Sequence, residues 1–320
     1  MINSTARLRT VRRGVAAAVC ALVALAGVAC SAEDPDVAAG KKESPSAGGS
    51  AEIPKQEINQ ELSDQLPEDI KKAKKITTVN SGSFPPYEII QTDGTASGAS
   101  ADLMTAMGQL WGIEVEHETV DGLSSILTGL SSERYQLAFG PIGDFKERQA
   151  SNDFVDYVQE FVVFAVPKGN PNKIDGIETT CGLKVAVQAG GSAEKVIKDQ
   201  AKKCKADGKD PVKVMSFKDQ PQSILSVQSG RADAFFSSQA PLTYFVKESK
   251  GKLELAGTGK ANGFDTLYQG AVVNKGSEMG PVVEESLKVL FENGTYEKIM
   301  KKWDLEDNMI DAPGKNLGVS

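Results

Sequence analysis

The chain has 320 residues, of which 36 are basic and 43 acidic, and its net charge is −7. This length is enough for one large or two medium domains. The acidic surplus argues against nucleic acid as a partner and against electrostatic binding to a bilayer.

The first 29 residues have the pattern of a secretion signal. Four arginines, the last of them Arg13, precede an uncharged apolar run, Val15–Ala29, that is too short for a comfortable membrane span. Small residues stand before Cys30 as at a bacterial lipobox, although Gly27 occupies the position where leucine is usual. We expect a signal peptide over residues 1–29 and a lipid on Cys30 that anchors the protein to the outer face of the cell membrane. Ordinary secretion with Cys30 unmodified is the alternative.

The segment that follows the signal has few apolar side chains that could form a core. Residues 30–55 contain almost no large apolar side chain, so they cannot offset the entropy lost on ordering, and we expect a flexible tether. Removal of the signal takes away four arginines and no acid, which leaves 32 basic against 43 acidic residues. The net charge of the mature chain is then −11.

Two cysteines remain in the folded part, Cys181 and Cys204. Outside the cytoplasm a leftover pair is most simply a disulfide. The bridge would stabilise the fold by about 3 kcal/mol in the chain-entropy model. A metal site is the weaker alternative, because the only histidine is His117 and no CxxC spacing occurs. We expect no metal and no cofactor.

Strands and helices alternate from Ile76 onward, which is typical of an α/β fold. A helix is predicted over residues 101–111, with Ser100 as its cap and Gly112 at its end. Residues 113–118 alternate apolar or neutral with acidic side chains, as in a half-buried strand.

One helix–turn–strand pattern occurs twice. Residues 124–140 resemble residues 222–238, about 98 positions later, and both hold a Ser-Ile-Leu helix, a polar turn and an apolar strand. The duplication predicts two similar α/β lobes. Apolar strands at 161–167 and 267–274 would carry the chain between the lobes.

The domain boundaries follow from this organisation. We expect the first part of lobe 1 at residues 56–166 and lobe 2 at residues 167–266. The chain would return to lobe 1 over residues 267–303 and end in a C-terminal tail, residues 304–320.

Six short motifs follow one another along the chain. They are SFPPYE, GASADL, KERQ, LKVAVQAGGSAEKVI, SGRADAFFSS and ENGTYEKIMKKW. In this order they resemble the extracellular solute-binding proteins of polar amino-acid ABC importers, family 3, from Lys75 to Trp303. The resemblance implies the two-lobed periplasmic-binding-protein fold with two hinge strands. It also implies capture of a small carboxylate-bearing solute, an amino acid or a derivative, and its delivery to a membrane permease.

The resemblance places the ligand's carboxylate at Arg148. A guanidinium is a planar, two-pronged donor that matches a carboxylate. The strand before it ends in small residues, so Gly143 can lend a backbone N–H. Arg148 could instead pair with Glu147, Asp153 or Asp156 on the surface.

The second lobe supplies a Gly-rich turn before a helix. Unpaired N–H groups around Gly191 and Ser192 would form an anion site at the start of that helix. Together with Arg148 across a cleft, they would clamp one carboxylate, and ligand binding would close the lobes.

Several positions depart from the family pattern. Ser238 stands where an aspartate usually holds the ligand's α-ammonium; Asp144 could replace that charge or be an ordinary loop residue. Phe84 keeps one aromatic wall of the site, with Tyr87 nearby, but Val120 stands where a second aromatic residue is common. The identity of the ligand therefore stays open.

The resemblance favours a monomeric binding protein with no catalytic residue. One alternative is an enzyme on the same scaffold, since cyclohexadienyl dehydratases resemble this family, but acid–base chemistry needs a carboxylic acid in a dry pocket or a positioned histidine. Another alternative is a sensor that reports its ligand to a membrane receptor.

Overall fold

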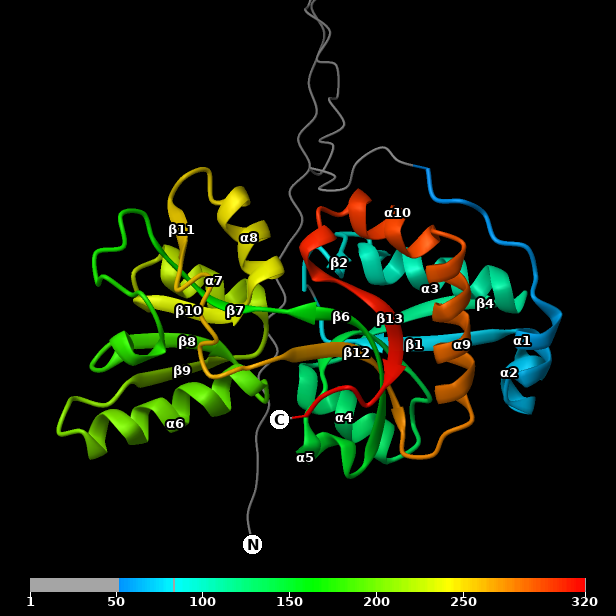
Figure 1. The fold of residues 1–320 in the computed structure, drawn as a ribbon, viewed down its shortest axis with the longest axis horizontal. Helices are drawn as coiled ribbons and strands as arrows, with labels where there is room; N and C mark the ends of the chain where they lie inside the picture. Colours follow the sequence, from blue (N-terminus) through cyan, green and yellow to red (C-terminus); the bar gives the residue numbers. More distant parts are fainter. Residues whose placement is uncertain (1–51, 83, 320) are drawn as a thin grey trace, which may run out of the picture. The chain divides into compact units, whose positions relative to one another are not determined.

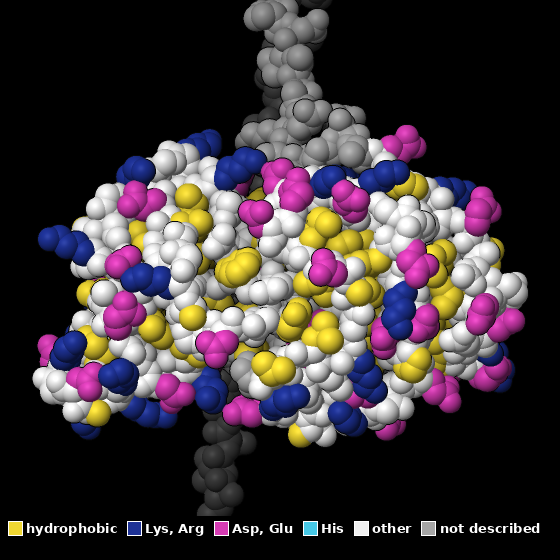
Figure 2. Space-filling model, viewed as in Figure 1, with side chains coloured by type: hydrophobic (Ala, Val, Ile, Leu, Met, Phe, Trp, Pro, Cys, Tyr) yellow, Lys and Arg dark blue, Asp and Glu magenta, His cyan; other side chains and the backbone are white. Residues whose placement is uncertain are grey.

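The computed structural model describes residues 52–82 and 84–319, which form two α/β lobes (Figure 1). The predicted signal peptide, Cys30 and nearly all of the predicted tether lie outside the described residues, so they stay predictions. No helix within the described ranges is long and apolar enough to cross a membrane. Acidic and basic side chains are interspersed over the face seen in Figure 2.

Lobe 1 is built on a parallel strand pair and a four-stranded antiparallel sheet, linked by a bridge between Thr78 and Leu137. The parallel pair is β1 (Lys75–Asn80) and β4 (Glu114–Thr119). The antiparallel sheet has, in spatial order, β13 (Met309–Lys315), β6 (Asn152–Glu160), β12 (Leu267–Asn274) and β5 (Ala138–Gly143). A small hairpin joins β2 (Ile89–Ile90) to β3 (Ala96–Ser97).

Helices cover both faces of the lobe 1 sheet. Successive side chains of β6 and β12 point to opposite faces of the sheet. Val155 and Val273 therefore pack in one core, and Phe154 and Val272 pack in the other. The first core lies under α1 (Gln60–Gln65), α2 (Glu68–Ala73), α3 (Ala99–Trp111), α9 (Met279–Glu292) and α10 (Thr295–Lys302). The second lies under α4 (Leu123–Ser131).

Lobe 2 has a five-stranded sheet that is likewise packed on both faces. Its strands, in spatial order, are β11 (Leu253–Ala256), β7 (Val162–Pro167), β10 (Ala234–Ser238), β8 (Lys184–Gln188) and β9 (Lys213–Phe217). One face packs against α6 (Ser192–Ala206) and the other against α7 (Gln220–Gln228) and α8 (Gln239–Glu248). The expected disulfide is confirmed: Cys181, after the short helix η1 (Ile177–Thr180), is bonded to Cys204 of α6.

Strand pairing corrects two of the expected boundaries. β7 pairs with β10 and β11, so it belongs to lobe 2, and the first crossing is at Phe161 rather than after residue 166. The expected C-terminal tail contains the 3-10 helix η2 (Glu306–Asn308) and β13, which pairs with β6. Residues 309–315 are therefore part of lobe 1. The return crossing, by contrast, lies before Leu267 as expected, because β12 pairs only with strands of lobe 1.

The start of α3 also differs from the expectation. The helix begins at Ala99, with Gly98 rather than Ser100 as its N-cap residue. A side chain at position 98 would collide with the backbone of Tyr87, its Cβ lying 2.3 Å from the carbonyl oxygen. Ser100 lies inside the first turn, and its hydroxyl contacts the Tyr157 hydroxyl at 3.0 Å. The predicted end at Gly112, in the left-handed conformation, is confirmed.

Candidate functional site

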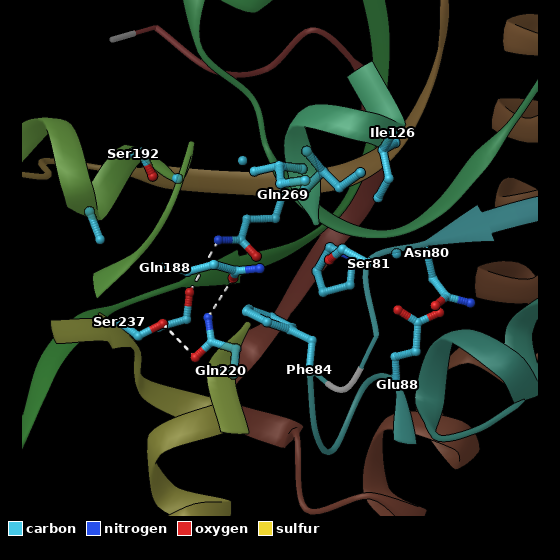
Figure 3. Close-up of a pocket in the computed structure, with 18 of the residues that line it drawn as sticks. Asn80, Ser81, Phe84, Glu88, Ile126, Gln188, Ser192, Gln220, Ser237 and Gln269 are labelled. Carbon is cyan, nitrogen blue, oxygen red and sulfur yellow. Dashed lines mark hydrogen bonds between the residues drawn. The ribbon is translucent and has the colours of Figure 1, made fainter. Parts of the chain in front are cut away.

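A cavity of about 90 Å³ lies between the two lobes (Figure 3). Lobe 1 lines it with the ends of β1 and β5 and the first turns of α4. Lobe 2 lines it with the end of β8, the first residues of α6 and α7, and the end of β10. The predicted ligand residues that line it are Phe84, Gly143, Arg148, Gly191, Ser192 and Ser238.

Arg148 spans the two lobes. Its Nη1 donates to the carbonyl oxygen of Gly143 in lobe 1 at 2.8 Å, and its Nη2 donates to that of Gly190 in lobe 2 at 3.1 Å. Burial lowers the pKa of Arg148 to about 10, while Glu147 and Asp144 act in the opposite direction, so the side chain stays cationic at neutral pH. A guanidinium has five N–H groups, so these bonds leave donors for a ligand. At Gly143 the observed contact is to the carbonyl; the expected N–H donation stays a prediction.

The surface pairing considered for Arg148 does not fit two of its proposed partners. Asp153 forms an ion pair with Lys275 at 2.9 Å instead. Asp156 is fully buried and accepts the backbone N–H of Leu317 at 2.9 Å. Arg148 lines the cavity instead.

The start of α6 faces the same cavity from lobe 2. Gly191 is the N-cap residue of this 15-residue helix, and Ser192 and Ala193 are its first two residues. The Gly191 N–H donates to the Gln188 carbonyl at 3.2 Å, so it is not free as expected. The N–H groups of Ser192 and Ala193 have no acceptor within the helix, and the helix dipole adds positive potential there. Gly190 donates its own N–H to the Glu194 carboxylate at 2.9 Å. Arg148 and the α6 start thus line one cavity from opposite lobes.

Tyr87 does not reach the cavity. Its side chain is fully buried, and its hydroxyl donates to Glu160 Oε1 at 2.6 Å. Its ring stacks on that of Phe84 at 6.0 Å between centroids. The expectation that Tyr87 binds ligand is therefore wrong: it supports Phe84 from behind. Val120 also lies off the cavity, against the core under α4.

Asp144 is turned away from the cavity as well. It follows Gly143 directly, is 1% exposed, and does not line the cavity. Its carboxylate accepts the N–H of Gly318 at 2.7 Å and Nε2 of Gln149 at 2.8 Å. Asp144 therefore cannot be the replacement countercharge for a ligand ammonium.

Glu88 is the acidic residue that sequence reasoning missed. It lines the cavity, is 5% exposed, and burial raises its pKa well above the usual value. Among the described residues that line the cavity, Glu88 is the only acid and Arg148 the only base. The signal was present, because Glu88 closes the SFPPYE motif, but its burial could not be seen in the sequence.

Lobe 2 presents amides and hydroxyls to the cavity (Figure 3). Gln220 donates to Gln188 Oε1 at 2.9 Å and accepts from the Ser237 hydroxyl at 3.0 Å. Gln269, on the returning strand β12, donates to the Ser238 hydroxyl at 3.3 Å. The Gln269 Oε1 atom is buried with no partner among the described residues. This wall can therefore donate and accept hydrogen bonds without carrying charge.

Comparison with known proteins identifies similar chains. An arginine-binding protein of Corynebacterium glutamicum is 27% identical over 252 residues, 78% of this chain and 81% of that protein. An L-cystine-binding protein of Bacillus subtilis is 24% identical over 240 residues, 74% of this chain and 84% of that protein.

Solved structures show the same architecture. An ancestral arginine-binding protein bound to arginine has a TM-score of 0.63 and 26% identity, covering 72% of this chain and 98% of that chain. The glutamine-bound form has a TM-score of 0.65 and 27% identity, covering 73% of this chain and 99% of that chain. The expected two-lobed fold is confirmed. Residues 76–306 match the family described as bacterial extracellular solute-binding proteins, family 3. The chain therefore belongs to the family 3 bacterial extracellular solute-binding proteins.

Proposed function

We propose that this chain captures an amino acid or amino-acid derivative between its lobes and delivers it unchanged to an ABC permease. The observation that carries the proposal is the convergence of the Arg148 guanidinium and the first N–H groups of α6 on one cavity. An anion bound by both would favour the closed arrangement, because it gains contacts that exist only when the lobes meet. The amino-acid-binding relatives support this choice of solute.

The ligand carries a second group that Glu88 recognises. Burial raises the pKa of Glu88 and so disfavours its ionised form, whereas a cation beside it would favour that form and offset the cost of burial. A neutral Glu88 would instead hydrogen-bond to an uncharged ligand. Arginine, for which the Corynebacterium relative is named, offers Glu88 a side-chain cation in addition to its α-carboxylate and α-ammonium.

Calorimetric titration with arginine and citrulline tests this assignment. The two amino acids have almost the same shape, but only arginine carries a side-chain cation. We expect arginine to bind at least about tenfold more tightly, a difference of about 1.4 kcal/mol. Glu88→Gln should remove most of that advantage and leave the affinity for citrulline nearly unchanged.

A wider thermal-shift panel checks the broader function. It includes amino acids, their derivatives and organic acids. A binding solute at a hundred times its dissociation constant should add about 2.7 kcal/mol of stability. A panel in which no carboxylate-bearing compound raises the melting temperature would contradict the proposed function.

The proposal includes delivery without chemical conversion. General acid–base catalysis requires positioned proton donors and acceptors. Glu88 is a carboxyl in the cavity, whereas His117 lies on β4 and does not line it. Mass spectrometry should recover the bound solute unchanged after prolonged incubation. A time-dependent product would favour an enzyme instead.

The mature protein is proposed to be a monomer held at the outer face of the membrane by a lipid on Cys30. The family is described as extracellular, which supports the compartment. Mass spectrometry of membrane-bound material should find an acylated Cys30, and light scattering of the chain without its lipid should give the monomer mass. An intact, unacylated Cys30 would contradict the proposed lipid anchor.

A further inference from the structure

The last described residues contact the turn that carries Arg148. The N–H of Gly318 donates to Asp144 Oδ2 at 2.7 Å, and the carbonyl of Gly318 accepts from Gln149 Nε2 at 3.0 Å. Asp144 precedes the turn, and Gln149 ends it. The two backbone polar groups of Gly318 therefore bind both ends of the segment from which Arg148 reaches the cavity.

Other groups also bond to this turn: Lys275 Nζ donates to the Gln149 carbonyl at 2.9 Å, Asn152 Nδ2 donates to the Arg148 carbonyl at 3.2 Å, and the Asp144 N–H donates to the Tyr268 carbonyl at 3.0 Å. α5 (Lys146–Gln149) is a single helical turn, in which the N–H groups of Arg148 and Gln149 both donate to the carbonyl of Phe145, at 2.8 and 2.9 Å. Gln149 Nε2 also donates to Asp144 Oδ1 at 2.8 Å. A short isolated helix is marginal in water, so outside contacts decide its stability.

Position 318 requires glycine. A Cβ atom there would lie 2.1 Å from the carbonyl oxygen of Asp144 and 2.8 Å from its carboxyl carbon. The close approach of the two backbones is what lets both polar groups of Gly318 reach the turn.

The same segment is bonded to the hinge strand β6. Asn316 exchanges two hydrogen bonds with the backbone of Phe154: its N–H donates to the carbonyl at 3.1 Å, and its Oδ1 accepts the N–H at 2.9 Å. The N–H of Leu317 donates to Asp156 Oδ2 at 2.9 Å. β6 continues through Phe161 into lobe 2, so the segment connects the Arg148 turn to the strand that crosses between the lobes.

Two buried carboxyl groups receive these N–H donors. Asp144 and Asp156 are 1% and 0% exposed, and Asp144 lies near enough to Asp156 to raise its pKa. No N–H or O–H donor among the described residues reaches Asp156 Oδ1. Burial and the nearby Asp144 raise the pKa of Asp156 to about 8. One oxygen of each carboxyl accepts an N–H of the segment.

We propose that Asn316–Gly318 is a positioning clamp that fixes the Asp144–Gln149 turn, and with it the Arg148 guanidinium, relative to the hinge strand. The clamp lies beyond residue 306, where the match to the family ends. Its effect on a ligand rests on the proposed function, but the clamp itself can be measured without any ligand.

Hydrogen–deuterium exchange of the ligand-free chain tests the clamp. Gly318→Ala should force the segment away from Asp144, and the amides of Arg148 and Gln149 should exchange at least about tenfold faster, while those of β8 in lobe 2 stay unchanged. Val319→Ala is the matched control, because that side chain is 72% exposed. Equal exchange of the turn in Gly318→Ala and the wild type overturns the proposal.

A second pair of variants separates positioning from a general loss of structure. Asp156→Asn can accept from Leu317 and donate to Asp144, so it reproduces the protonated acid and should keep slow exchange in the turn. Asp156→Ala cannot, and should accelerate it. Equal exchange rates in these two variants would overturn the role of the carboxyl pair.

The affinity for arginine supplies the functional readout. Gly318→Ala should weaken arginine binding about tenfold, with Val319→Ala unchanged. If the wild type does not bind arginine, the assignment of arginine as ligand fails. The exchange measurements, which need no ligand, still test whether the clamp fixes the turn. Faster exchange in the turn with unaltered arginine affinity would overturn the positioning of Arg148.

Discussion

The two lobes contribute different chemistry to the same cavity. Lobe 1 provides both charged side chains that line it, Arg148 and Glu88, whereas lobe 2 provides glutamine amides, serine hydroxyls and a helix start. Charge-assisted hydrogen bonds are about twice as strong as neutral ones. We therefore expect lobe 1 to determine which ligand charges are accepted, and lobe 2 to complete the hydrogen bonds on closure.

Removal of the lobe 1 cation should have the largest effect. Arg148→Ala removes the guanidinium proposed to bind the ligand's carboxylate through two hydrogen bonds. Hydrogen bonds to charged groups contribute about 1.5–3 kcal/mol each, so ligand affinity should fall more than about a hundredfold. Calorimetry measures the loss. Arg231→Ala is the control, because Arg231 is exposed in lobe 2 and lies over Phe217. Similar losses in both variants would contradict the assignment of charge recognition to lobe 1.

Loss of the disulfide should weaken lobe 2 selectively. Cys181 and Cys204 are 23 residues apart, and closing such a loop stabilises a fold by about 3 kcal/mol. Replacing both with serine should lower the free energy of unfolding by about this amount in urea denaturation. Hydrogen exchange should accelerate in α6 and not in α3. Uniform acceleration across both lobes would show that they do not unfold separately.

Closure itself can be obstructed at Gly190. This residue has a φ of 74°, and a Cβ atom there would lie 2.7 Å from Ser124 Oγ of lobe 1. Gly190→Ala should weaken ligand binding about tenfold. Gly208→Ala is the matched control, since its φ is 71° and nothing lies near its added Cβ. Ser124→Gly should restore part of the affinity lost in Gly190→Ala; no restoration would mean that backbone strain alone causes the loss.

Asp156 should make the free energy of unfolding depend on pH, a smaller effect than those above. Burial and Asp144, the charged group that faces it, raise the pKa of Asp156 to about 8 in the folded chain. The folded state then binds more protons than the unfolded state between about pH 4 and pH 8, so the free energy of unfolding falls as the pH rises through this range. The slope is at most about 1.4 kcal/mol per pH unit for one proton.

Asp156→Asn provides the comparison for this slope. Its side chain does not titrate, so the wild type minus variant difference isolates the Asp156 contribution. Denaturation at several pH values measures it. A difference that does not change between pH 5 and pH 8 would contradict the raised pKa.

Local sequence patterns predicted the two-lobed fold and several of the residues that line the cavity. The repeated helix–turn–strand unit indicated two lobes, and the motifs around Arg148 and Ser192 indicated residues that do line the cavity. Those features depend on residues near in sequence. Tyr87 and Asp144 were misplaced because their partners, Glu160 and Gly318, lie 73 and 174 residues away.

β13 escaped prediction for a related reason. Its sequence, MIDAPGK, contains Pro313 and Gly314, which disfavour a strand interior, and its pairing with β6 is irregular between Met309 and Gly314. An edge position tolerates such residues, because a strand there needs hydrogen bonds on one side only.

The chain path also favours an order of folding. The sheet of lobe 2 is made from one continuous segment, β7 to β11, and its disulfide closes a local loop. The sheet of lobe 1 needs β13, whose partner β6 lies about 150 residues earlier in the sequence. When the chain is released from its N-terminus onward, lobe 2 can complete its sheet before β13 is available to lobe 1.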